Sequence, residues 1–472
     1  MKNLLRLSFA VLAGLLLLSA CSRTDGVTVK TEDGLLVRFQ VMGEKTIRVS
    51  ATPDKQFADR KSLVVLPSDA KVPFKVDEAD GWVTVSTAAV KASVQKATGK
   101  MRFTDAEGKE LLASGEGGEI TFQPIEVEGK KAYSVHTVFD SPADEAFYGL
   151  GQQQTGEFDH KGLNEELYQY NTKISIPFVV SSRGYGLLFD AYSLSRWGNP
   201  KPYQHLGDIF KLYDKEGNEG ALTGTYVTRR STLVQREETL DYENERLISD
   251  LPKLPLAGAV VTYEGEIEAP VEGDYYFTQY YAGFQQTEIG GEEVMSRRWR
   301  PAWNPNSYRY CVHFKAGERK PVKVVWEPDG GVSYFSLKVA VPQSAEEQSR
   351  LSFWSEFEPQ ADFYFFAGDT YDEVISGYRN LTGKASLYPK WSFGFWQSRE
   401  RYSTQEELVS TLAELRRRKI PVDNIVQDWH YWEEDQWGSH EFDKTRYPDP
   451  EKMLDDVHAM HGRFMISVGP KF

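Results

Sequence analysis

The feature that most constrains the fold of this chain is a short apolar run that ends abruptly in polar and aromatic residues. Ile425, Val426 and Gln427 are followed directly by Asp428, and an aromatic-rich stretch then continues to Trp432. A buried parallel strand has this pattern when it presents polar groups at its carboxyl end. We therefore expect a parallel sheet around this segment, with Asp428 at its carboxyl edge.

A strand and a capped helix are predicted before this run. Residues 391–396 have the pattern of a strand that ends at residues 397–399. Ser403 and Glu406 form the capping-box pattern of a helix start, and Pro421 prevents the helix from continuing. Leucines repeat along this helix at spacings of four and three, which predicts one buried stripe. These leucines are Leu408, Leu412 and Leu415.

A second helix and another strand follow the run. Asp449 and Pro450 match the N-cap and the first residue of a helix. Its predicted inner face consists of Met453, Val457 and Met460. Residues 464–468 have the composition of the next strand. The order strand, helix, strand, helix, strand is typical of a β/α barrel or of an open doubly wound sheet.

These motifs resemble a known family. Residues 389–399, 420–428 and 442–450 are closely similar to the opening of the catalytic barrel in glycoside hydrolase family 31, and within it to the bacterial α-xylosidases. The resemblance implies a (β/α)8 TIM barrel, of which residues 387–472 would be the first part, because a closed barrel takes roughly 250 residues. It also implies a nucleophile after the fourth barrel strand and an acid/base after the sixth, both expected beyond Phe472.

The resemblance assigns roles to residues at the strand ends. It implies that Asp428 hydrogen-bonds hydroxyls of the sugar in the glycone subsite and does not attack. Of Trp429 and Trp432, we expect one to line that subsite and the other to pack inside. Trp396 and Arg399 are further candidates for substrate contact, although a buried ion pair would explain Arg399 equally well. The prediction includes no catalytic carboxylate in this chain, no metal and no cofactor.

Charge and composition exclude some classes of partner. The chain has 69 acidic and 55 basic residues, a formal net charge of −14, and both signs are interspersed. A nucleic acid or an anionic membrane surface would require a basic stripe, so a neutral substrate is expected. The acidic residues 433–435, with His440 and Asp443, lie in a Gly- and Trp-containing turn. There, acids are usually solvated or capping rather than metal ligands.

The start of the chain has the pattern of an export signal. An apolar run at residues 7–18 follows basic residues and is too short to span a bilayer. The small residues before Cys21 resemble a bacterial lipoprotein cleavage site. We expect a signal peptide at residues 1–20, a lipid on Cys21 and a periplasmic or outer-membrane-associated location in a Gram-negative bacterium; the alternative is an ordinary signal. Cys311 would then have no disulfide partner, and its alternating strand predicts a buried side chain.

Two β-sandwiches are expected between signal and barrel. Residues 21–223 show short alternating strands between turns, and resemble the galactose-mutarotase-like sandwich that precedes the family 31 barrel. Residues 224–343 resemble an inserted PA14 domain, without its calcium-binding Asp-Asp-Gly turn. Three aromatic residues of this insert are candidates for stacking on sugar: Trp299, Trp303 and Tyr308. Residues 344–386 return to the first sandwich and end in a linker helix capped by Thr370 and Glu373.

Two readings of the function follow. The first is a retaining α-glycosidase, most similar to an α-xylosidase that removes terminal α-xylosyl residues from xyloglucan oligosaccharides, with an α-glucosidase of the same family as the alternative sugar specificity. The second is a noncatalytic glycan-binding surface lipoprotein. Strands that end in residues 397–399 and in Asp428 favour the enzyme, because a barrel active site requires polar strand ends and a binding module does not.

Overall fold

The computed structural model describes residues 25–67, 71–115, 120–153, 157–169, 173–198, 201–242, 257–302, 304, 307–328 and 334–469. The chain divides into two compact units, Met1–Gly383 and Lys384–Phe472. The predicted signal peptide, Cys21 and Trp303 lie outside the described residues. Within the described part, no helix has both the length and the apolar character needed to cross a membrane.

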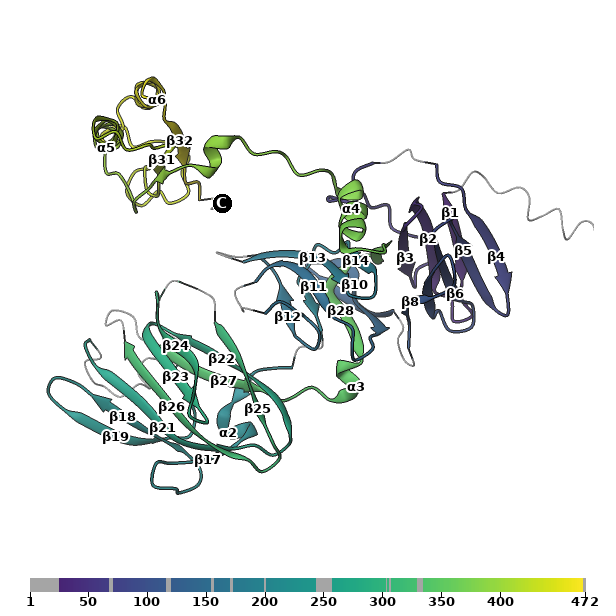
Figure 1. Ribbon diagram of the computed structural model, residues 1–472, viewed down its shortest axis with the longest axis horizontal. Helices are drawn as coiled ribbons and strands as arrows, with labels where there is room; N and C mark the ends of the chain where they lie inside the picture. The colour runs from purple at the N-terminus through teal and green to yellow at the C-terminus, as the bar shows by residue number, and fades with distance from the viewer. Residues whose placement is uncertain are drawn as a thin grey trace, which may run out of the picture. The chain divides into compact units, whose positions relative to one another are not determined.

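The first unit begins with a β-sandwich built from three antiparallel sheets (Figure 1). One sheet has the order β1 (Gly26–Lys30), β2 (Leu36–Gly43), β3 (Thr46–Thr52), β29 (Ala361–Ala367), β14 (Tyr185–Phe189), β13 (Ile174–Ser181) and β11 (Phe147–Gln152). A second has the order β4 (Lys75–Ala79), β5 (Trp82–Ser86), β6 (Val90–Gln95), β7 (Met101–Asp105) and β8 (Glu110–Ala113). The third has the order β12 (Glu165–Leu167), β15 (Ser195–Trp197), β28 (Arg350–Glu358), β10 (Lys130–Asp140) and β9 (Thr121–Val127).

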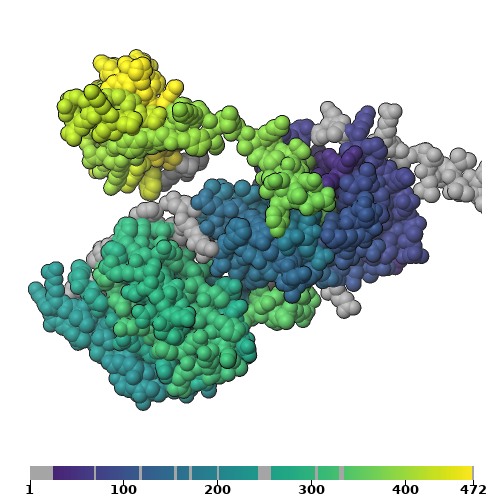
Figure 2. All heavy atoms as spheres, viewed as in Figure 1, coloured from purple at the N-terminus to yellow at the C-terminus, as the bar shows by residue number. Residues whose placement is uncertain are grey.

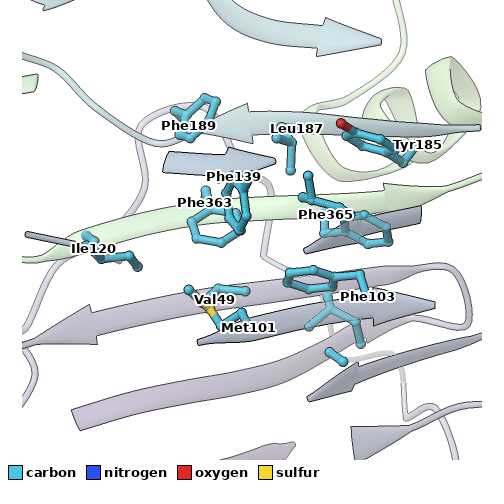
Figure 3. Close-up of a cluster of buried hydrophobic side chains, with 14 of the residues drawn as sticks. Val49, Met101, Phe103, Ile120, Phe139, Tyr185, Leu187, Phe189, Phe363 and Phe365 are labelled. Carbon is cyan, nitrogen blue, oxygen red and sulfur yellow. The ribbon is translucent and has the colours of Figure 1, made fainter. Parts of the chain in front are cut away.

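Alternating apolar residues from all three sheets meet in one core. In β2, for example, every second residue is buried, as expected when one face of a strand packs inward. Phe103 of β7 stacks on Phe365 of β29 with ring centroids 4.4 Å apart, and Phe139 of β10 meets Phe363 edge to face (Figure 3). Strands that are more than 200 residues apart in sequence therefore share one hydrophobic cluster.

The chain leaves this sandwich and later returns to its middle. β28 pairs with β10 and β15, and β29 lies between β3 and β14. Helix α4 (Tyr371–Thr382) follows; its N-cap Thr370 accepts a hydrogen bond from the Glu373 N–H, and Gly383 ends it with a φ of 100°. The helix lies on the first sandwich and buries Val374 and Leu381 against a separate small cluster (Figures 1 and 2).

A second sandwich lies between the two passes through the first. One sheet has the order β16 (Gln204–His205), β27 (Phe335–Ala340), β22 (Gly273–Tyr281) and β25 (Tyr308–Phe314), with β20 (Asp241–Tyr242) on β27. The other has the order β19 (Thr232–Glu237), β18 (Leu222–Val227), β21 (Val260–Glu268), β26 (Arg319–Pro328), β23 (Gly283–Ile289) and β24 (Glu292–Arg300), with β17 (Lys211–Tyr213) on β21. A short helix, α2 (Leu206–Ile209), lies between β16 and β17, and another, α3 (Ala345–Gln348), follows β27 in sequence.

The second sandwich differs from the expectation in two respects. Its strands begin at Gln204, before the expected boundary at residue 224, because alternation identifies a strand without saying which sheet it joins. Cys311 lies in a strand as predicted, but its side chain is exposed and not buried. It shares a face of β25 with Arg309 and His313, whereas Tyr310 and its alternate neighbours point inward.

The second unit is a parallel α/β assembly. Its sheet has the order β30 (Trp396–Gln397), β31 (Asn424–Gln427) and β32 (Arg463–Ile466), and the strands are connected by α5 (Gln405–Arg417) and α6 (Pro450–Ala459). Helix α6 starts with Asp449 as N-cap and Pro450 as first residue, as predicted. The predicted inner faces of both helices meet β31 in one cluster. Its helical members include Leu408, Leu412, Met453 and Val457.

Two local predictions in this unit are wrong. Residues 391–396 do not form a strand: Lys390–Phe393 is a 3-10 helix (η2), and only Trp396 and Gln397 pair with β31. At Gly394, which ends η2, the Asp423 carboxylate occupies the space of a side chain, since a Cβ there would lie 1.9 Å from Asp423 Oδ2. The N-cap of α5 is Thr404 and not Ser403. The Thr404 hydroxyl accepts from the Glu407 N–H at 3.1 Å, so the capping pattern is shifted by one residue.

Candidate functional site

The carboxyl end of β31 is anchored by a buried amide side chain. Gln427 is fully buried, and its Nε2 donates to the carbonyls of Tyr402 at 3.3 Å and Asp428 at 3.0 Å. The next residue, Asp428, emerges half-buried, and its Oδ1 accepts a hydrogen bond from the Trp429 N–H at 2.8 Å. A charged acceptor therefore lies at the strand end, where the parallel pattern placed it.

The two tryptophans after Asp428 have different environments. Trp432 is 3% exposed and packs with Tyr431 inside the cluster of α5, α6 and β31. Trp429 is 43% exposed. Of the two candidates, Trp429 is therefore the one whose ring is available to a ligand, and Trp432 is a core residue in this structure.

The two candidates from the preceding strand have local partners. Trp396 is half-buried and donates from Nε1 to the Ser392 carbonyl at 3.1 Å. Arg399 pairs with Glu407 at 2.7 Å, but its side chain is 56% exposed, so this ion pair is at the surface and not buried. Among the described residues, no hydrogen bond or ring contact joins either of them to Asp428 or Trp429.

Arg446 holds the turn that carries the candidate site, and sequence reasoning missed it. Its guanidinium bonds Asp443 at 2.8 Å and donates to the carbonyls of His430, at 3.1 Å, and Trp432. Hydrogen bonds from Thr445 and Arg446 hold the pKa of Asp443 well below its ordinary range. The signal in the sequence was the spacing of three between Asp443 and Arg446, which permits a local ion pair.

A second basic residue acts on the same turn. Arg401 donates to His430 Nδ1 at 2.6 Å. Burial lowers the pKa of His430, and the charges of Arg401 and Arg446 lower it further, so the imidazole is neutral near pH 7 and can accept this bond. The acids at 433–435 are exposed. Across the described part of the chain, no three His, Cys, Asp or Glu side chains converge as metal ligands do.

Trp437 is a further aromatic residue that the sequence reasoning treated only as part of a turn. Its side chain is 62% exposed, and its ring centroid lies 6.1 Å from that of Trp429. The structure thus brings together Asp428, Trp429 and Trp437 at one strand end. Its sequence signal was a large aromatic residue beside Gly438 in an otherwise polar turn.

Comparisons with known proteins identify two domains. Residues 385–472 match the model of the glycosyl hydrolases family 31 TIM-barrel domain, and residues 36–197 match that of the glycosyl hydrolase 31 N-terminal galactose mutarotase-like domain. An α-xylosidase of Saccharolobus solfataricus is 25% identical over 448 residues, which are 93% of this chain and 40% of that protein. Alpha-glucosidase 2 of Bacillus thermoamyloliquefaciens is 34% identical over 109 residues, 23% of this chain and 14% of that protein.

Solved structures show the same relationship. The family 31 α-xylosidase from Xanthomonas citri has a TM-score of 0.84 and 42% identity, covering 96% of this chain and 50% of that one. A family 31 α-xylosidase from a soil metagenome, solved with xylose, shares the fold with a TM-score of 0.57 at 19% identity, covering 95% of this chain and 46% of that one. This chain thus spans half or less of the length of these relatives. With its N-terminal sandwich and its barrel segment each matching the family's own domains, the chain belongs to glycoside hydrolase family 31.

Proposed function

We propose that this protein is a retaining α-glycosidase of the α-xylosidase type, and that this chain supplies contacts to the terminal sugar. The observation that carries the proposal is the Asp428 carboxylate at the carboxyl end of β31, beside the exposed ring of Trp429. Sugar hydroxyls donate to carboxylates in charge-assisted hydrogen bonds, and an indole face packs on the apolar face of a pyranose. Active sites of β/α barrels are built at this end of the strands.

Asp428 is proposed as a binding residue and not as the nucleophile. Retaining hydrolysis requires two carboxyl groups about 5–5.5 Å apart, one attacking and one acting as acid and base. We assign neither role to a residue of this chain. Asp428 would instead accept hydroxyl hydrogen bonds of the glycone, and its own bond from the Trp429 N–H fixes the orientation of the carboxylate.

The proposed sugar is α-linked xylose, as at the ends of xyloglucan oligosaccharides. Support comes from the extent of the likeness in sequence: the Saccharolobus α-xylosidase aligns with 93% of this chain, whereas the Bacillus α-glucosidase aligns with 23%. Xylose lacks the hydroxymethyl group of glucose, so specificity requires bulk near C5. Trp396 is the half-buried candidate for that bulk, since Trp432 is enclosed in the core.

We further propose that the protein is exported and anchored by a lipid on Cys21, and that the second sandwich is a PA14-like insert. The support for the anchor is the apolar run and the small residues before Cys21. Replacing Cys21→Ser is expected to move the protein from the membrane fraction to the soluble fraction of a Gram-negative host. Retention in the membrane fraction would contradict the anchor.

Binding by the chain itself tests the proposed function. Isothermal titration with α-xylosyl-(1→6)-glucose and with isomaltose compares a xylosyl with a glucosyl end. We expect the chain to bind the xyloside more tightly than isomaltose and to hydrolyse neither. The isosteric Asp428→Asn variant should lose at least about tenfold in affinity, since a hydrogen bond to a charged group is worth about 1.5–3 kcal/mol. Equal binding of both sugars would overturn the xyloside specificity, and no binding of either would overturn the function.

An aryl α-xyloside assay separates the roles of the carboxylates. If this chain released the aryl group, and Asp428→Asn abolished the release, the assignment of Asp428 as a binding residue would be wrong. Glu441→Gln is a matched control, because this exposed acid lies on the same turn without a proposed role.

A further inference from the structure

Two exposed tryptophans lie side by side across the ends of two neighbouring strands. Trp429 directly follows Asp428 at the end of β31. The Trp437 indole lies beside the segment that follows β32, since a Cβ added at Gly469 would lie 3.2 Å from its Nε1. The ring centroids are 6.1 Å apart and the ring planes are tilted by 40°. The pair therefore lies beside the segments that follow β31 and β32.

The turn that carries Trp437 is an ordered one. The Gln436 N–H donates to the Glu433 carbonyl at 3.1 Å, and the Ser439 N–H donates to the Gln436 carbonyl at 2.9 Å. Gly438 adopts a φ of 94°, which a residue with a side chain rarely takes. The exposed Trp437 side chain is thus carried by a defined turn, next to a second exposed indole.

We propose that Trp429 and Trp437 form one aromatic platform on which a neutral pyranose ring stacks, and that Trp437 is a specificity-determining residue for the substrate. The inference rests on the proposed function of Asp428. A pyranose ring held between the two indole faces would need about 7–8 Å between those faces, since each contact takes about 3.5–4.0 Å. The indoles are closer than that, so they form a bent floor and not a slot.

The charge of the turn indicates which sugars the platform accepts. Glu433, Glu434 and Asp435 are all exposed on the segment that leads to Trp437. Two basic groups that contact this turn are engaged: Arg446 pairs with Asp443, and Arg401 bonds His430. The carboxylates at 433–435 therefore repel a uronic acid and leave a neutral sugar unaffected.

Titration calorimetry of four forms of the chain tests the platform with α-xylosyl-(1→6)-glucose as probe. Trp437→Ala is expected to weaken binding about tenfold, while Trp437→Phe keeps a ring and recovers most of it. Phe393→Ala is the matched control, because Phe393 is 80% exposed in the same unit and has no proposed contact. Near-ultraviolet circular dichroism verifies that each variant is folded.

The outcomes separate this inference from the proposed function. If the wild type binds and Asp428→Asn does not, but Trp437→Ala binds like the wild type, the platform is overturned and the function stands. If the wild type binds no xyloside, the proposed function fails and the platform fails with it. A uronide, methyl α-glucuronide, serves as the second probe, and binding as tight as that of methyl α-xyloside would overturn the selection for neutral sugars.

Discussion

At the scale of single residues, Arg446 connects the candidate site to its support. One guanidinium bonds the Asp443 carboxylate and the carbonyls of His430 and Trp432, so three points of one turn converge on a single side chain. Tyr431 is held as well, because its carbonyl accepts from the Asp443 N–H at 2.9 Å. The backbone that follows the exposed Trp429 is thereby fixed, which reduces the conformational entropy that is lost when a sugar binds.

Asp443 makes the stability of this turn depend on pH. Its folded pKa lies far below its ordinary value of 3.8, owing to bonds from Thr445 and Arg446. An acid with a depressed folded pKa stabilises the fold fully above the unfolded value, and that contribution is lost as pH falls below about 4. We expect Asp443→Asn to lower the urea midpoint at pH 7, with a gap to the wild type that narrows by pH 2.5. Tryptophan fluorescence measures both midpoints.

The control for this prediction is another acid of the same turn. Glu441 is exposed, and Glu441→Gln should leave the urea midpoint unchanged at both pH values. A gap for Asp443→Asn that stayed constant between pH 7 and pH 2.5 would show that titration of this carboxylate does not contribute to stability.

At the scale of elements, helix α5 shows how a cap is selected. Ser403 and Thr404 are both good N-cap residues, and each is followed three positions later by a glutamate. The structure uses the second pair: Thr404 accepts from the Glu407 N–H, and the Glu407 carboxylate accepts from the Ser403 N–H at 2.7 Å. Glu407 also pairs with Arg399, which ties the end of β30 to the start of the helix.

The choice of cap predicts unequal effects of two neighbouring substitutions. Thr404→Ala removes the acceptor for the Glu407 N–H and should lower the free energy of unfolding by about 1 kcal/mol. Ser403→Ala leaves the backbone N–H that Glu407 binds and should change it by less than about 0.5 kcal/mol. Chemical denaturation of the full chain measures both. The reverse order would place the cap at Ser403, as the sequence pattern suggested.

At the scale of the whole molecule, a buried ion pair joins the two sandwiches of the first unit. Arg309 of β25 bonds Glu165 of β12 at 2.5 Å and the Asn164 carbonyl at 2.8 Å. The Glu165 side chain is only 2% exposed. Gln343 adds a bond to the Asn164 side chain at 3.0 Å. Besides the two chain segments that connect the sandwiches, these side-chain bonds hold the second sandwich against the first. We call this set of bonds the joint.

Replacing one partner of the Arg309–Glu165 ion pair should lower the free energy of unfolding strongly, and replacing both should change it little. Arg309→Met leaves Glu165 buried without its main cation, which costs about 3–5 kcal/mol, whereas the double change to Met at both positions is near neutral. Calorimetry measures the stability. Hydrogen exchange at residues 157–169 and 308–314 should rise in the single variant alone. Unchanged exchange in that variant would mean that the joint does not hold the sandwiches together.

Local chemistry accounts for what could be predicted in the second unit. Asp449 and Pro450 start α6 because a cap and a first-turn proline depend only on residues within one helical turn. Leu408 and Leu412 are buried because the helical period places them on one face of α5. The prediction failed at residues 391–396, where η2 replaces a strand. There the decisive contact is with Asp423, about thirty residues away, whose carboxylate accepts from the Phe395 N–H at 3.2 Å.

The sequence by itself determined the parallel rhythm of strands and helices, the position of Asp428 at a strand end and the family resemblance, because these depend on residue spacing along the chain. Only the tertiary structure decided that Trp429 is exposed while Trp432 is enclosed, and that Trp437 joins Trp429. The reason is physical: which side of a turn faces solvent depends on contacts such as those of Arg446, which reach carbonyls 14 and 16 residues away.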